Sequence, residues 1–176
     1  MVLVARSALD YRLAAKIGAL FGILSGVFGE PMQAIAFLAL NDLIYGSHLL
    51  PQTISSMASN STDLALTTLT NALAGVIAGV LYVIVFEKLK NKIPTQRTQT
   101  KALIFYLVAS VLLDWIPYLV QTNPDSLRTP YYIGTYLESF SVSIVTTMFW
   151  GTLFAYAVTR MDKKIIDKST RIGQLE

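Results

Sequence analysis

The chain has 176 residues, of which 53% are hydrophobic and only 14% are charged, and its mean hydropathy is +0.53. Soluble domains carry about 25% charged residues, so this composition indicates a protein of the lipid bilayer. The absence of cysteine excludes disulfides and thiolate metal sites, and the single histidine, His48, excludes metal motifs that need two histidines. We therefore expect no cofactor.

Four long apolar stretches follow one another along the chain, at residues 17–40, 64–86, 102–120 and 133–158. Each has close to the ~20 residues that an α-helix needs to cross the hydrocarbon core of a bilayer. The connections between them are too short for a separate soluble domain. The sequence therefore predicts an all-α fold, an integral membrane four-helix bundle, that forms one transmembrane domain over residues 1–176.

The basic residues predict the orientation of these helices. The formal net charge is +3, and all 14 Lys and Arg residues except Arg128 lie in the N-terminal segment, the second connection or the C-terminal tail. With four spans these three segments share one side of the membrane, and basic residues favour the cytoplasmic side. We expect both termini in the cytoplasm and the protein in the plasma membrane. The first connection, on the outer side, contains a candidate N-glycosylation site at Asn60.

A stripe of small residues runs along the first predicted helix. Gly18, Gly22 and Gly26 repeat at a spacing of four residues, which places them on one helix face. The second predicted helix offers a comparable face that includes Asn71 and Gly75. Small residues let helix backbones approach closely in lipid. Two interpretations are open, namely packing of the first helix on the second within the chain, and pairing with a second copy.

Hydroxyl side chains are dense on the fourth predicted helix, where Ser139, Ser143, Thr146 and Thr147 share one face. Such hydroxyls can bond to the carbonyls of their own helix, so they do not by themselves mark a path for a solute. Their density nevertheless predicts an interior face that points toward the first and third helices.

Acidic side chains inside membrane helices are costly, and three occur here: Glu30, Asp114 and Glu138. They fall in the outer half of the predicted bilayer, at a depth that also includes Asn71. No Lys or Arg lies deep in any predicted span to pair with them. A proline follows two of these acids and frees a backbone carbonyl beside each of them.

Three interpretations of this arrangement are open. In the first, the acids bind or pass a hard cation, for which carboxylates are suitable ligands, although the sequence singles out no particular metal. In the second, Glu30 carries a proton whose binding couples to the movement of a solute. In the third, Asp114 and Glu138 reach the outer headgroups and Glu30 is hydrogen-bonded inside the bundle.

The sequence lacks the motifs of membrane hydrolases and of phosphate-binding loops, and its basic residues lie where orientation alone requires them. We expect a non-enzymatic membrane protein without a nucleic-acid partner that handles a cation or small solute through an outward-facing acidic and polar pocket. Four helices are few for a complete path, so we also expect a homo-oligomer or a membrane-complex partner. The alternative function is that of a structural or accessory subunit that docks through the glycine-rich face of the first helix.

Overall fold

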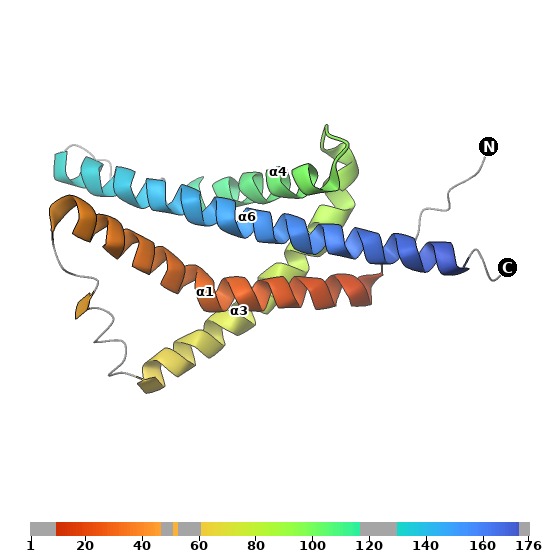
Figure 1. The fold of residues 1–176 in the computed structure, drawn as a ribbon, viewed down its shortest axis with the longest axis horizontal. Coiled ribbons are helices and arrows are strands. Elements are labelled where there is room, and N and C mark those ends of the chain that lie inside the picture. The colour runs from red at the N-terminus through yellow and green to blue at the C-terminus, as the bar shows by residue number, and fades with distance from the viewer. Residues whose placement is uncertain (1–9, 47–50, 53–60, 117–129, 173–176) are drawn as a thin grey trace.

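The computed structural model describes residues 10–46, 51–52, 61–116 and 130–172, and these residues are helical without any strand. The elements are α1 (Tyr11–Tyr45), α3 (Ser61–Leu89), the short 3₁₀ helix η1 (Lys90–Lys92), α4 (Thr98–Ser110), the π-helix η2 (Val111–Trp115) and α6 (Pro130–Ile172). The predicted all-α class is confirmed, and the prediction of four helices fits when α4 and η2 are taken together as the third (Figure 1).

The helices extend beyond the predicted apolar stretches, to capping residues in α1 and to a further core residue in α6. α1 begins after Asp10, whose side chain accepts a hydrogen bond from the backbone N–H of Leu13 at 3.1 Å. It ends at Gly46, which has a φ of 61° in the left-handed region that favours glycine. α6 continues past residue 158 because Met161 there is fully buried in the core. Its 43 residues measure roughly 65 Å at about 1.5 Å per residue, twice the thickness of the hydrocarbon core.

The third predicted helix departs most from a regular α-helix. Over η2 the backbone N–H groups donate to the carbonyl five residues earlier in the chain instead of four. The N–H of Ile116, for example, donates to the carbonyl of Val111. Pro117 comes next in the sequence and has no N–H, so it cannot continue the regular pattern of donors. Residues 117–120, the end of the predicted span, lie outside the described residues.

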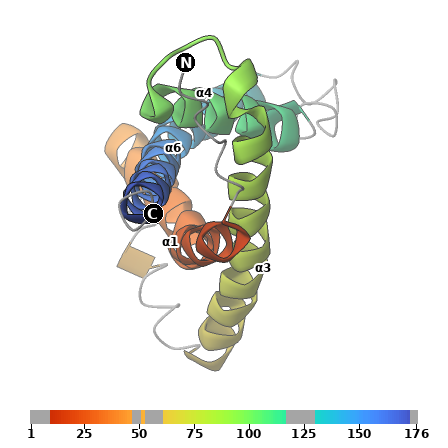
Figure 2. The same ribbon diagram turned by 90° about the vertical axis from the view of Figure 1, so that its right-hand side faces the viewer.

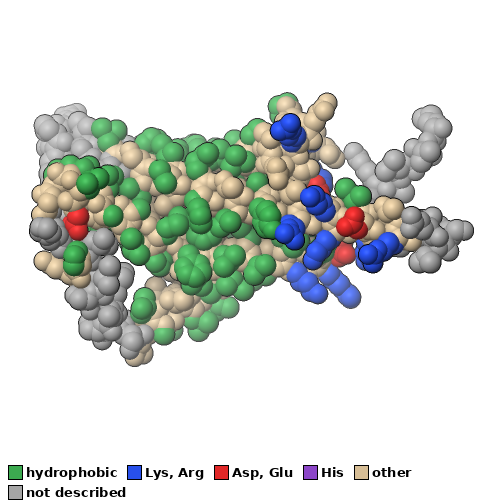
Figure 3. Space-filling view, in the orientation of Figure 1, with side chains coloured by type: hydrophobic (Ala, Val, Ile, Leu, Met, Phe, Trp, Pro, Cys, Tyr) green, Lys and Arg blue, Asp and Glu red, His purple; other side chains and the backbone are tan. Residues whose placement is uncertain are grey.

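Three helices in the described part of the chain are long and apolar enough to cross a membrane: Tyr11–Tyr45, Leu64–Lys92 and Ser139–Arg171. Large apolar side chains such as Leu43, Leu66 and Val145 are exposed on their outer faces. Figure 3 shows apolar side chains over the middle of the molecule, while Lys and Arg gather at one end, which we call the basic end. A surface of this kind fits a membrane protein, since lipid rather than water covers exposed apolar side chains there.

α1 and α3 cross with their backbones in direct contact. A Cβ atom built on Gly18 would lie 2.6 Å from the carbonyl oxygen of Gly79, and one built on Gly22 would overlap the carbonyl of Gly75. Any side chain at these positions would force the two backbones apart. The glycine stripe therefore packs on α3 inside the chain, and it does not offer a free face to a second copy or to another protein.

Beyond this crossing α1 and α3 separate (Figures 1 and 2). The last glycine contact is that of Gly26 with the backbone of Asn71. α1 contains Pro31 and then bends toward α6, as expected where a helix loses a backbone donor. The N-terminal part of α3 points away from the bundle instead. In the half that lies farther from the basic end, α3 is therefore separated from the other helices.

The half nearer the basic end is filled by an aromatic core. Phe154 of α6 is fully buried at its centre. Five rings from α1, α3 and α4 have centroids 5.3–6.0 Å from that of Phe154, those of Phe21, Tyr82, Phe86, Phe105 and Tyr106. Aromatic pairs at such distances stabilise a core beyond their buried area. This aromatic core joins all four helices.

Ion pairs tie the helices together at the basic end. The ammonium of Lys90 lies 2.8 Å from the carboxylate of Glu87 and 3.0 Å from that of Asp162, and thereby joins the end of α3 to α6. Lys168 of α6 lies 3.6 Å from Asp10, the residue that caps α1. These contacts hold α1, α3 and α6 together at the basic end of the molecule, beyond the aromatic core.

α1 contains glycines that contact the α3 backbone, such as Gly22, and one that does not, Gly29, and together they make a matched test of the crossing. We expect Gly22→Ala to lower the free energy of unfolding by about 1–3 kcal/mol, because its methyl group would meet the Gly75 backbone. Gly29→Ala adds the same methyl group only 3.7 Å from Trp150 Nε1, an ordinary contact, and should leave stability unchanged or slightly higher. Thermal unfolding in detergent micelles measures both, and equal effects of the two variants would contradict the close crossing.

The cap of α1 should make stability depend on pH. The hydrogen bond from the Leu13 N–H, followed by the positive charge of Lys168, lowers the pKa of Asp10 below its usual value. A lowered pKa means that Asp10 contributes stability above its ordinary pKa and that this contribution is lost as the pH falls through the lowered value. The thermal midpoint of Asp10→Ala should thus lie slightly below that of the wild type at neutral pH, and the gap should narrow toward about pH 3. A gap that widens on acidification would contradict this role.

Candidate functional site

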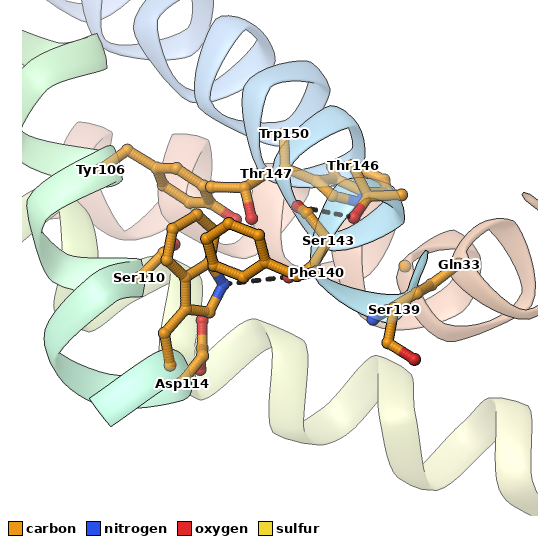
Figure 4. Close-up of a pocket in the computed structure, with 12 residues that line it drawn as sticks. Gln33, Tyr106, Ser110, Asp114, Ser139, Phe140, Ser143, Thr146, Thr147 and Trp150 are labelled. Carbon is orange, nitrogen blue, oxygen red and sulfur yellow. Dashed lines mark hydrogen bonds between the residues drawn. The ribbon is translucent and has the colours of Figure 1, made fainter. Parts of the chain in front are cut away.

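A polar cavity of about 520 Å³ lies between α1, the α4–η2 helix and α6, on the side of the aromatic core away from the basic end (Figure 4). We call it the polar cavity. Its lining residues are Gly29 and Gln33 of α1, Tyr106, Ser110, Asp114 and Trp115 of α4–η2, and Ser139, Phe140, Ser143, Thr146, Thr147 and Trp150 of α6. Its volume lies within the ~300–1,000 Å³ range of cavities that hold small organic molecules.

The hydroxyl face of α6 forms one wall of this cavity, and it faces the first and third helices as expected. Some of its hydroxyls are already bonded within the chain. Thr146 is buried and donates to the carbonyls of Val142 at 3.0 Å and Ser143 at 3.1 Å in its own helix. The hydroxyl of Ser143 accepts a hydrogen bond from the indole N–H of Trp115 at 2.9 Å.

The opposite wall depends on the π-helix. Ser110 and Asp114 are four residues apart and both line the cavity; Ser110 is only 2% exposed, whereas Asp114 is exposed. Trp115, although next to Asp114 in the chain, also lines the cavity, which the wide turn of η2 permits. The ring of Trp115 packs on Phe140 with a centroid distance of 4.9 Å. No hydrogen bond or ion pair holds the carboxylate of Asp114 among the described residues.

Trp150 supplies an unpaired donor at the deep end of the cavity. This residue is 6% exposed, and its buried Nε1 has no hydrogen-bond partner. Below it lies Phe21 of the aromatic core, with a ring distance of 6.4 Å. Leaving a buried donor unpaired costs about 1–3 kcal/mol, so an acceptor from water or a ligand would be stabilised there. Gly29 of α1 faces this nitrogen: a Cβ atom built on it would lie 3.7 Å from Trp150 Nε1.

The predicted site residues are placed differently from one another. Asp114 lines the polar cavity, whereas Asn71 does not, because its part of α3 packs on Gly26 at the crossing with α1. Glu30 and Glu138 belong to α1 and α6 and directly adjoin the cavity residues Gly29 and Ser139, but their side chains lie outside the described residues. His48 and the glycosylation candidate Asn60 also lie outside them. Whether the three acids meet therefore stays a prediction.

The sequence reasoning missed the aromatic members of the cavity. Trp150 lies seven residues after Ser143 and three after Thr147, so the helical repeat of α6 places it on the hydroxyl face, a signal that was present in the sequence. Trp115 had no such signal, because a regular α-helix would turn it about 100° away from Asp114 and only the π-helix brings both to one wall.

Comparisons with known proteins add no family. No family model matches the chain, and neither a curated protein nor a solved structure matches it significantly.

Proposed function

We propose that this chain is a multi-pass protein of the plasma membrane, with residues 1–176 forming one four-helix transmembrane domain and both termini in the cytoplasm. Its function would be non-enzymatic, the binding or passage of a cation or small solute through an outward-facing pocket. Three helices long and apolar enough to span a membrane support the first part. The gathering of Lys and Arg at one end of the molecule supports the orientation, since such residues favour the cytoplasmic side.

The observation that carries the functional proposal is the polar cavity itself. Polar groups are costly in an apolar membrane bundle unless they are hydrogen-bonded. The hydroxyl of Thr146 meets this requirement within its own helix, but the buried indole N–H of Trp150 does not among the described residues. The carboxylate of Asp114 lies at an exposed position of η2 and has no hydrogen bond or ion pair among those residues either. A bound cation and a bound hydrogen-bond acceptor would satisfy these two groups.

The position of the cavity supports access from outside the cell. The cavity residues of α6 run from Ser139 to Trp150, whereas the basic residues of the same helix begin at Arg160. The aromatic core around Phe154 lies between the two. Dense aromatic packing would block a solute on the cytoplasmic side, while the polar cavity lies on the other side of this core.

The alternative function, an accessory subunit, would need a docking surface other than the glycine-rich face of α1. That face is covered by α3, with Gly18, Gly22 and Gly26 all in backbone contact. Exposed apolar side chains remain on other faces of the bundle, where lipid, a second copy or a partner subunit would cover them.

The test uses the absence of cysteine from the chain, because any thiol label then reports an introduced residue. Ser139→Cys, in intact cells, should react faster with a cationic methanethiosulfonate (trimethylammonium-ethyl) than with the anionic sulfonatoethyl reagent of similar size. Adding Asp114→Asn should lower the ratio of the cationic to the anionic reaction rate roughly fivefold, because one nearby negative charge is then lost. Asp167→Asn removes an exposed carboxylate of α6 near the basic end and is the matched control, for which we expect no change.

Two results would contradict the proposal. One is a reaction of Ser139→Cys only in inverted vesicles, which would place the cavity on the cytoplasmic side. The other is a charge preference that Asp114→Asn leaves intact, which would remove Asp114 from any cation pathway.

A further inference from the structure

We propose that the ligand of the polar cavity is a small organic ammonium ion that also carries an oxygen acceptor, an amino alcohol such as choline, rather than a bare metal ion. This inference rests on the proposed function and names the class of solute. It depends on two features at opposite ends of the cavity, a carboxylate beside aromatic rings and a buried indole donor without a partner.

The side chains that line the cavity, among the described residues, do not suit a bare divalent ion. Ca²⁺ takes six to eight oxygen ligands at about 2.3–2.6 Å, and Mg²⁺ requires a compact octahedron. Among the described residues the cavity contains a single carboxylate, that of Asp114, and no cluster of three or more acidic, histidine or cysteine side chains occurs there. A space of about 520 Å³ is also far larger than one dehydrated ion fills.

The outer end of the cavity suits an ammonium group. Asp114 supplies the negative charge, and the rings of Trp115 and Phe140, 4.9 Å apart, stand beside it. Trp115 is held in place by its hydrogen bond to Ser143. Cations bind over aromatic faces, tryptophan best of all, and a carboxylate combined with such rings is a recurrent way to recognise quaternary ammonium groups. A methylated ammonium also sheds water far more readily than Na⁺ or Mg²⁺.

The inner end of the cavity suits an acceptor. Trp150 Nε1 can only donate, and it is buried without a partner in front of Gly29. A pure cation cannot satisfy it, whereas a hydroxyl or ester oxygen can. Ser143 and Trp150 are seven residues apart on α6, or roughly 10 Å along the helix axis. Because Ser143 holds Trp115 at the outer end, a ligand that reaches both features must be longer than a single ion.

The binding test uses the two tryptophans of the chain, both of which line the cavity, so selectively excited tryptophan fluorescence reports only on this site. The purified full chain in detergent is titrated with choline, tetramethylammonium, 3,3-dimethylbutan-1-ol (the neutral analogue of choline), NaCl and MgCl₂. We expect a saturable change with choline, weaker binding of tetramethylammonium by roughly threefold to tenfold for the lost hydrogen bond, and no saturable change with the neutral analogue or the salts.

Two variants test which end of the cavity binds the ammonium group and which end binds the oxygen acceptor. Asp114→Asn should weaken choline and tetramethylammonium alike, roughly tenfold or more, whereas Asp167→Asn should change neither. Trp150→Phe keeps an aromatic ring but removes the N–H, so the affinity for choline should fall to that for tetramethylammonium, while the affinity for tetramethylammonium itself stays unaffected. The comparison of ligands on the wild-type protein decides the inference even if a variant fails to fold.

The outcomes separate this inference from the proposed function. Saturable binding of Na⁺ or Mg²⁺ that Asp114→Asn abolishes, without binding of choline, would overturn the ammonium ligand and keep the cation pocket. Equal binding of choline and its neutral analogue would overturn the ammonium ligand and keep a pocket for a neutral solute. The absence of any response to all five solutes would overturn the ammonium ligand, and the charge preference of Ser139→Cys would then decide the proposed function independently.

Discussion

The backbone contact between α1 and α3 is the constraint on which the rest of the structure depends. Gly18 and Gly22 meet Gly79 and Gly75 with no side chain between the helices, so the crossing point is fixed by the backbones themselves. Past Gly26, where these contacts stop, α3 departs from the bundle and α1 bends toward α6 (Figure 1). The close contact at one level thus leaves α3 apart from the other helices at another.

The side chains follow the same division. Where the helices are close, large aromatic rings surround Phe154 and leave little space. Farther from the basic end, between α1, α4–η2 and α6, the small polar side chains of Ser139, Ser143 and Thr147 on α6 leave space unfilled. The polar cavity is therefore a consequence of residue size as well as of helix geometry. Ion pairs around Lys90 reinforce the closed half, and so the two halves differ in chemistry and in packing.

The sequence predicted those features that follow from a regular helical repeat. The all-α class, the face shared by Gly18 and Gly22, and the hydroxyl wall with Ser143 and Thr147 all depend on a repeat of about 3.6 residues. The helix ends were missed, because caps such as Asp10 and Gly46 lie outside the apolar stretches. The wall made by Asp114 and Trp115 together was also missed, because the π-helix breaks the regular repeat and only the backbone bonding of η2 reveals it. The sequence also grouped Asn71 with Asp114, because both lie at a similar depth in the predicted bilayer. Depth alone does not determine which neighbouring helix a residue faces.

The central claim is that the bundle is sealed around Phe154 and open from the outer side as far as Trp150. Single cysteines at Thr147, in the cavity, and at Val158, which is fully buried in the core, test it most directly. A membrane-impermeant thiol reagent applied to intact cells should modify Thr147→Cys and leave Val158→Cys unmodified, and in inverted vesicles it should modify neither. Modification of Thr147→Cys from the cytoplasmic side, or equal reaction at both positions from outside, would contradict the account.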